Sequence, residues 1–259
     1  MSLARPRVRT WRRSLRALVH TGRVRAALSA PLTEQIEPGP KAVTMIEDRS
    51  RLTVARRPRQ GSLGDCWVLA PMLAIFETAP ERLATLLEPA EGRRVRVRLP
   101  GSSLSVLIDR RLPVDRRGRF AYARQDGGPP GWAGALEKAI AVQVAGSYGF
   151  LQRGFGRFGL ELLTGQRVRT HLRSPSTHQI LAWQAQHRAI VASTHPFSHR
   201  VRTGGWPLAP QHVYAVVGAD PSTGLVQLRN LVRPGEVMSV DAKVLRRGFL
   251  AVDVSAPLR

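Results

Sequence analysis

Residues 59–70 read RQGSLGDCWVLA and contain Cys66, the only cysteine in the 259-residue chain. Two glycines precede this cysteine and an apolar run follows it, so the pattern predicts a loop that turns into a helix near Asp65. Asp65 is a natural N-cap residue, and a thiol in the first helical turn lies near unpaired backbone N–H groups that lower its pKa. Two interpretations stay open: an inert buried cysteine, which burial alone favours, or a nucleophile that a nearby histidine activates.

The chain on either side of this stretch predicts a mainly helical first half around a short hairpin. Helical apolar density continues through residues 67–76, and residues 81–88 predict a second, shorter helix. Residues 93–100 and 103–115 alternate apolar and charged side chains, as half-buried strands do. Residues 130–151 predict one long helix entered through a proline and a glycine.

The second half changes character near residues 163–168. Short β-branched runs separated by turn residues follow, and they predict an antiparallel sheet. These runs are residues 188–194, 212–220, 224–230 and 245–254. We therefore expect an α+β protein with a helical lobe over residues 46–165, a β lobe over residues 166–259 and a cleft between them.

Composition sets limits on the class of protein and its partners. The net charge is +22, but only three of the 40 basic residues are lysines. This bias favours a solvated arginine-rich surface over a nucleic-acid site, although an acidic partner stays open. No apolar run is long enough to span a membrane and no signal peptide is recognisable, so we expect a cytoplasmic protein or one exported without such a signal. A single cysteine excludes an internal disulfide framework.

Residues 1–45 predict a basic extension and linker. Residues 1–33 contain no acidic side chain, and apolar residues from Trp11 to Val19 recur at roughly helical spacing. This segment is either a basic amphipathic helix on an anionic surface or a frayed extension. Residues 31–41 are rich in proline and glycine, which is typical of a linker.

A histidine and an asparagine occur at the two ends of one predicted hairpin. His212 opens the first strand, and reflection through a turn centred near Pro221 puts residue 212 or 213 opposite Asn230. Side chains at such positions lie within hydrogen-bonding reach, and an amide would fix the orientation of the imidazole. The alternative is a polar hairpin end without a catalytic role. Cys66, His212 and Asn230 follow the chain order of papain-like proteases.

The segment QGSLGDCW, residues 60–67, resembles the cysteine motif of the calpain family of cysteine proteases. Further segments resemble successive landmarks of the family in the same order, between about Arg57 and Val232. They are SLSVLIDRRLPVD, GWAGALEKAIAVQVAGSYGFL, LELLTG, QHVYAVVGA and LVQLRN. The resemblance implies a two-lobed papain-like protease core that hydrolyses peptide bonds in protein or peptide substrates.

The resemblance also implies roles for four residues. Cys66 is the nucleophile, His212 the general base and acid, and Asn230 the residue that orients the histidine. Gln60 matches the family glutamine whose amide donates to the oxyanion, a contribution of about 3 kcal/mol per donor.

Two departures from the family concern the quality of the site. Calpains usually follow the catalytic asparagine with Pro-Trp-Gly, whose tryptophan shields the His–Asn bond from water, whereas this chain has Leu-Val-Arg at residues 231–233. Val232 is a poor shield, so we expect a weaker ion pair. Pro71 falls inside the catalytic helix, where it removes an N–H group and is expected to kink the helix.

A third departure concerns calcium. Arg57 and Gly149 stand at the positions where calcium-dependent members carry acids, and residues 162–219 contain no carboxylate. Because calcium needs oxygen ligands, we expect no metal, no other cofactor and no calcium requirement. The chain ends about 29 residues after Asn230, so we expect a bare, bacterial-type catalytic domain.

Three functions therefore stay under consideration. The first is a calcium-independent calpain-like cysteine endopeptidase. The second is a catalytically impaired calpain-like pseudoprotease that acts as a basic binding module, which Pro71 and the altered flank of Asn230 motivate. The third is a transglutaminase or deamidase, because such enzymes use Cys-His machinery in related folds.

Overall fold

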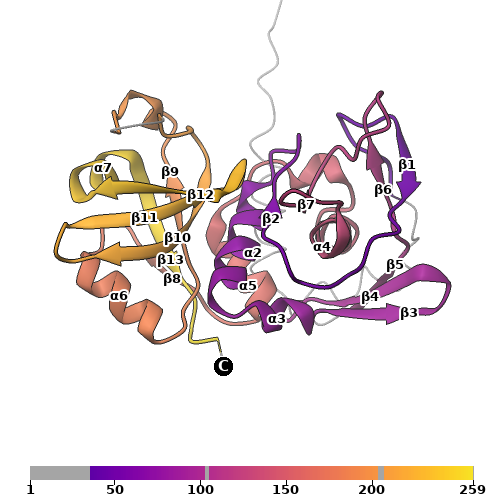
Figure 1. The fold of residues 1–259 in the computed structure, drawn as a ribbon, viewed down its shortest axis with the longest axis horizontal. Helices are drawn as coiled ribbons and strands as arrows, with labels where there is room; N and C mark the ends of the chain where they lie inside the picture. Colours follow the sequence, from indigo (N-terminus) through magenta and orange to yellow (C-terminus); the bar gives the residue numbers. More distant parts are fainter. Residues whose placement is uncertain (1–35, 103–104, 204–206, 259) are drawn as a thin grey trace, which may run out of the picture. The chain divides into compact units, whose positions relative to one another are not determined.

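Mixed helices and antiparallel strands form the described part of the protein, which confirms the expected α+β class (Figure 1). The structure is a computed structural model that describes residues 36–102, 105–203 and 207–258. These residues belong to one compact unit, Glu34–Arg259. The predicted basic helix within residues 1–33 lies outside the described residues.

Helix α2, Cys66–Thr78, begins where the sequence predicts and is buried along its first ten residues. It continues as one α-helix through Pro71, whose missing N–H group leaves the carbonyl of Trp67 without its helical partner. Helix α5, Gly156–Thr164, packs against this point through Gly159. A Cβ atom on Gly159 would lie 2.1 Å from the Trp67 carbonyl oxygen and 2.7 Å from Pro71 Cγ. Only glycine therefore permits this close approach of the two helices.

Helix α3, Pro80–Ala84, is shorter than predicted, because the chain becomes a strand over residues assigned to the helix. Strand β3, Leu87–Ala90, pairs with β4, Arg94–Arg98, which in turn pairs with β5, Ser105–Ile108. Glu88 precedes a proline, and this position disfavours helical backbone. The three-residue 3₁₀ turn η2, Glu91–Arg93, connects β3 to β4.

The long helix predicted over residues 130–151 is broken into three pieces. Helix α4, Gly131–Ile140, is entirely buried and passes into the π-helical turn η3, Ala141–Ala145. Gly146 then adopts a left-handed conformation with φ of 70°, which ends the helix in the way typical of a C-terminal glycine. A 3₁₀ turn, η4 (Tyr148–Leu151), follows.

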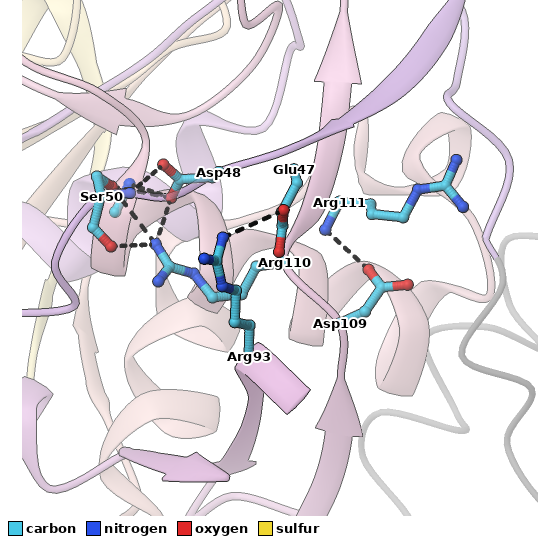
Figure 2. Close-up of polar contacts among 8 residues, drawn as sticks. Glu47, Asp48, Ser50, Arg93, Asp109, Arg110 and Arg111 are labelled. Carbon is cyan, nitrogen blue, oxygen red and sulfur yellow. Dashed lines mark hydrogen bonds and ion pairs between the residues drawn. The ribbon is translucent and has the colours of Figure 1, made fainter. Parts of the chain in front are cut away.

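A buried acid ties the start of α4 to the strands beside it (Figure 2). Strands β1, Thr44–Glu47, and β6, Arg111–Val114, pair with each other, and Asp48 directly follows β1. Its carboxylate accepts hydrogen bonds from the Arg110 guanidinium at 2.7 Å and from the Gly131 backbone N–H at 3.0 Å. A carboxylate at a helix N-terminus is favoured by the helix dipole, so Asp48 stabilises the first turn of α4.

The second half forms a six-stranded antiparallel sheet in the order β12-β11-β10-β9-β13-β8, which agrees with the predicted sheet. Its strands are β8 (Arg169–His171), β9 (Ile190–Thr194), β10 (Val213–Asp220), β11 (Leu225–Asn230), β12 (Arg233–Asp241) and β13 (Phe249–Val254). The sequence interpretation missed β8 and β12. Strand β12 is a mostly exposed edge strand that contains proline and glycine, so its alternation signal is weak.

Two helices and a 3₁₀ turn lie in this half and were not predicted. They are α6 (Thr177–Ala185), α7 (Ala242–Gly248) and η5 (Ser198–Arg200). Ile180 is the one buried residue of α6, so its sequence lacks the apolar stripe that marks an amphipathic helix.

Helix α2 also contacts strands β9 and β10, so the cysteine-bearing helix packs against the large sheet (Figure 1). A short two-stranded sheet of β2, Pro58–Arg59, and β7, Arg124–Gln125, holds the segment that leads into α2. Within the described ranges, no helix has the length and apolarity to cross a membrane.

Candidate active site

Cys66 is the first residue of α2 and lies against strand β10. The residue is only 7% exposed, and the Val213 backbone N–H lies within hydrogen-bonding reach of the sulfur. His212 immediately precedes Val213. The contact therefore brings Cys66, the predicted nucleophile, close to His212, the predicted base.

The His212 ring is held by a hydrogen bond to Asn230. Its Nε2 atom lies 3.0 Å from Asn230 Oδ1. The Val232 backbone N–H also donates to Oδ1, at 3.2 Å, which identifies this atom as the amide oxygen. Nε2 therefore carries the ring proton, and Nδ1 keeps a lone pair that can accept a proton.

Neighbouring residues fix the backbone and the ring plane of His212. Its backbone N–H donates to Thr194 Oγ1 at 2.9 Å, and its carbonyl accepts from the Thr194 N–H at 2.8 Å. The Tyr214 ring meets the imidazole edge to face, with ring centres 4.9 Å apart. The imidazole therefore has one well-defined position.

The hairpin turns later in the chain than predicted. Asp220 pairs with Leu225, so the centre of the turn lies between Ser222 and Thr223 and not near Pro221. The Asp220 carboxylate accepts hydrogen bonds from both of these hydroxyls, at 2.6 and 2.7 Å. Such side-chain bonds to the following residues are typical of Asx turns and fix where the chain reverses.

The register that follows makes His212 and Asn230 diagonal neighbours. After a bulge in β10, Ala215 pairs with Arg229. Continued to the open end of the hairpin, this register puts Tyr214 opposite Asn230. The prediction of a directly opposed pair was therefore wrong, although diagonal side chains on one face still meet, as the 3.0 Å contact demonstrates.

The resting site favours a neutral thiol and a neutral imidazole. Burial, with a smaller contribution from the charge of Asp65, raises the pKa of Cys66 to about 11, against the lowering effect of nearby backbone N–H groups. Burial also lowers the pKa of His212 to about 4. The expectation that the helix N-terminus leaves the thiol with a lowered pKa was wrong, because desolvation outweighs the backbone dipoles.

The sequence interpretation expected Asp65 to cap the helix with its side chain. The structure shows no such bond. The backbone carbonyl of Asp65 accepts the Val68 N–H at 2.8 Å, whereas its carboxyl group points inward and is completely buried. There it meets the carboxyl group of Glu137 on α4, a residue that sequence reasoning missed. The sequence signal that could have identified Glu137 is its position as the one acid on an otherwise apolar face of the predicted helix.

Gln60 lies in the loop that leads to Cys66, and its amide is engaged within that loop. Its Nε2 donates to the Leu63 carbonyl at 2.7 Å and to Asp65 Oδ1 at 3.3 Å. Its backbone N–H donates to the Leu231 carbonyl at 3.0 Å, so the loop is bonded to the residue that follows Asn230.

Val232 lies two residues after Asn230 and is 51% exposed. It lines a groove of about 280 Å³ whose other walls are charged or glycine. The lining residues besides Val232 are Arg59, Asp126, Arg233, Gly235 and Glu236. A valine side chain thus leaves this side of the His–Asn pair open.

Glu77, near the end of α2, bridges two arginines from separate segments. Its carboxylate pairs with Arg57, which precedes β2, and with Arg229 of β11, whose Nε lies 3.4 Å away. Arg229 directly precedes Asn230, so this cluster connects the cysteine helix to the strand that carries the asparagine. Across the described ranges, no group of three or more His, Cys, Asp or Glu side chains is arranged to hold a metal ion.

Comparison with known proteins relates this geometry to a family. Residues 40–234 match the calpain family cysteine protease domain. The chain is 29% identical over 186 residues to calpain-type cysteine protease ADL1 of Oryza sativa subsp. japonica, and the match covers 66% of this chain and 9% of that protein.

Animal calpains are similar over a comparable stretch. Calpain-12 of Mus musculus is 29% identical over 71% of this chain, and the calpain-2 catalytic subunit of Gallus gallus is 25% identical over 67%. In both cases the match spans 26% of the relative. These relatives come from plants and animals, so they lend no support to the expected bacterial type.

The family match covers about three quarters of the chain, and it includes the cysteine loop, helix α4 and the hairpin that carries His212 and Asn230. Members of this family are cysteine proteases and act on proteins. The chain therefore belongs to the calpain family of cysteine proteases.

Proposed function

We propose that this protein is a cysteine endopeptidase that hydrolyses peptide bonds with Cys66, His212 and Asn230, without calcium or another cofactor. The observation that carries the proposal is the 3.0 Å contact between His212 Nε2 and Asn230 Oδ1, next to a thiol at the start of α2. This bond leaves Nδ1 as the basic atom of the ring.

The reaction follows from these protonation states. The Cys66 thiol gives its proton to His212 Nδ1 as the sulfur attacks the substrate carbonyl carbon, and the carbonyl oxygen becomes an oxyanion. The C–N bond then breaks, and the imidazolium gives its proton to the leaving amine. Water, deprotonated by the imidazole, hydrolyses the thioester and restores the thiol.

The neutral resting pair makes proton transfer part of the attack itself. A thiol with a pKa of about 11 and an imidazole with a pKa of about 4 do not form a stable ion pair before substrate binds. Charge then develops only as the substrate carbonyl accepts the sulfur, and the Asn230 amide stabilises the imidazolium at that moment.

The Cys66 backbone N–H and the Gln60 amide are the proposed oxyanion donors. The longer of the two Gln60 bonds, 3.3 Å to Asp65 Oδ1, is the one that an oxyanion would replace. The 2.7 Å bond to the Leu63 carbonyl keeps the amide in the loop during this exchange.

Charge at the junction of α2 and β11 supports independence from calcium. Glu77 is already paired with two guanidinium groups, Arg57 and Arg229, so it is a poor ligand for a cation. In this proposal, the ion pairs of Glu77 hold α2, β11 and the segment before β2 together without a metal ion.

The test uses the full chain and the variant Cys66→Ala with an unfolded substrate such as reduced casein at pH 7.5. We expect cleavage by the wild type, equal rates in calcium and in EDTA, and no cleavage by C66A. A thiol-directed epoxide should label Cys66 and stop the reaction. Absence of new peptide termini under all these conditions would contradict the proposal.

A pseudoprotease that acts as a basic binding module is the second candidate. The raised pKa of Cys66 and the lowered pKa of His212 favour it, because both shifts disfavour the reactive ion pair. Under this alternative the epoxide leaves Cys66 unlabelled. Mass spectrometry of the treated substrate separates both candidates from a deamidase, which changes the mass without creating new termini.

A further inference from the structure

Two buried carboxyl groups meet directly behind the cysteine. Asp65 precedes Cys66 and is 0% exposed, while Glu137 on α4 is 1% exposed. Their side chains lie within hydrogen-bonding reach of each other. Both oxygens of Glu137 also accept the Ala123 backbone N–H, at 3.1 and 3.2 Å.

This contact requires a proton between the two groups. Ionised carboxylates are acceptors only, so two of them cannot form a hydrogen bond with each other. Asp65 Oδ2 is buried and has no partner unless the facing carboxyl group carries a proton. Burial raises the pKa of Asp65 to about 6, against the lowering effect of the contact with Glu137, and burial together with the charge of Asp65 raises the pKa of Glu137 well above its usual range. The buried contact therefore favours one proton shared by the two carboxyl groups over two facing negative charges.

The pair touches the site through Asp65. Its Oδ1 accepts the Gln60 amide at 3.3 Å, and its backbone carbonyl accepts N–H groups of the first turn of α2. Its charge also raises the pKa of the Cys66 thiol. The same carboxyl group thus acts on the proposed oxyanion donor and on the proposed nucleophile.

Other titratable groups surround the pair. Tyr122, between β6 and β7, and Tyr148 of η4 are both affected by its charge, and their rings are in contact. Lys138 follows Glu137 on α4, and its ammonium is bonded to Asp109 and to the Arg111 carbonyl. Together with Cys66, these are the ionisable neighbours that a pH profile of the pair has to account for.

We propose that Asp65 and Glu137 are positioning residues for the peptidase reaction, sharing one proton so that Asp65 Oδ1 stays an acceptor that holds the Gln60 amide beside Cys66. This inference rests on the proposed function. Neither residue touches the substrate; they act through Gln60 and through the field at the thiol.

The test compares Asp65→Asn, Glu137→Gln and an exposed control on β3, Glu88→Gln. Cys66 is the only thiol in the chain, so its alkylation by iodoacetamide reports its ionisation without any need for peptidase activity. D65N removes the adjacent negative charge, and we expect alkylation at pH 8 about tenfold faster than in the wild type. E137Q keeps one negative charge and should change the rate by less than about twofold, and E88Q should match the wild type.

Infrared spectroscopy tests the shared proton itself. The wild type should show a protonated-carboxyl band at pH 7 that E137Q lacks and E88Q retains. This measurement does not need D65N, so it remains valid even if D65N fails to fold.

Kinetics test the positioning role. D65N and E137Q should lower kcat by about 10- to 100-fold with KM nearly unchanged, because an oxyanion donor acts in the transition state. The wild-type rate should also fall below about pH 6, where Asp65 takes up a proton, and D65N, which has no carboxyl group at this position, should lack this limb.

A wild-type alkylation profile in D65N, together with an unchanged carboxyl band in E137Q, overturns the inference. So does an unchanged kcat in both variants when the wild type is active. If the wild type cleaves nothing, the proposed function fails, and the alkylation and infrared results still decide whether the pair shares a proton.

Discussion

The buried histidine makes the stability of this protein depend on pH, and the variant His212→Gln isolates that dependence. Burial lowers the pKa of His212 from 6.5 to about 4, so between these values the unfolded chain binds a proton that the folded chain does not. Acidification then stabilises the unfolded state, so the free energy of unfolding decreases as the pH falls from 6.5 to 4. Each pKa unit corresponds to about 1.4 kcal/mol, so this one group should remove roughly 2–3 kcal/mol by pH 4.5.

The assay is urea denaturation followed by tryptophan fluorescence, for wild type and H212Q, at pH values from 7.5 to 4.5. At pH 7.5 the two proteins should already differ in free energy of unfolding, because H212Q loses the hydrogen bond to Asn230. The prediction concerns how this difference changes with pH. The free energy of unfolding of H212Q minus that of the wild type should rise by roughly 2–3 kcal/mol as the pH falls. H178Q, at an exposed position on α6, is the control for removing an imidazole. A constant difference across the range would refute burial as the cause of the neutral imidazole.

Asp65 acts in the opposite direction within the same pH window. Its folded pKa is raised from 3.8 to about 6, so below pH 6 the folded chain binds a proton more readily than the unfolded chain does. This gain offsets the loss from His212, and the wild-type profile should be flatter than either group alone would make it. D65N removes the gain, so its stability should fall more steeply between pH 6 and 4.5 than that of the wild type.

Three further changes test the packing and the surroundings of the site. Gly159→Ala places a Cβ atom 2.1 Å from the Trp67 carbonyl oxygen, and we expect urea denaturation to show a loss of about 1–3 kcal/mol or more; wild-type stability would show that α5 can move away freely. Val232→Trp has open space beside it and should raise kcat several-fold by shielding the Asn230 amide, whereas an unchanged kcat would mean that water does not weaken this bond. Glu77→Gln should lower stability by roughly 1–3 kcal/mol, because it leaves two guanidinium groups without their shared partner, and thermal unfolding at low and high salt should show the loss shrinking as salt rises.

Much of the first lobe was predictable because its signals are local. A loop rich in glycine followed by a continuous apolar run specifies helix α2 at Cys66, and alternation of valine with arginine specifies β4. The helix that was predicted over residues 81–88 failed because backbone pairing with β4 outweighs helical propensity there. Helix α6 was missed because its buried face consists of Ile180 alone.

The candidate site divides in the same way. Proximity of Cys66, His212 and Asn230 was expected from the hairpin and the family motif, and the His–Asn contact lies where the expectation put it, although the register differs. The inward turn of Asp65 toward Glu137 was not predictable, since the two residues lie on separate elements 72 positions apart in the chain. The carboxyl group of Asp65 could either cap α2 or turn inward toward Glu137. Only the packing of α4 against the loop selects between these two positions.

By itself, the sequence determined where the chain forms α2 and the hairpin strands, which residues are candidates for catalysis and which family they indicate, because these depend on side-chain order over short distances. Only the tertiary structure decided the protonation of those residues. Desolvation by segments that are distant in the chain outweighs the local helix dipole at Cys66 and the intrinsic basicity of His212. The physical state of the site is therefore a property of how α2, α4 and the large sheet pack around it, and the identity of its residues is a property of the sequence.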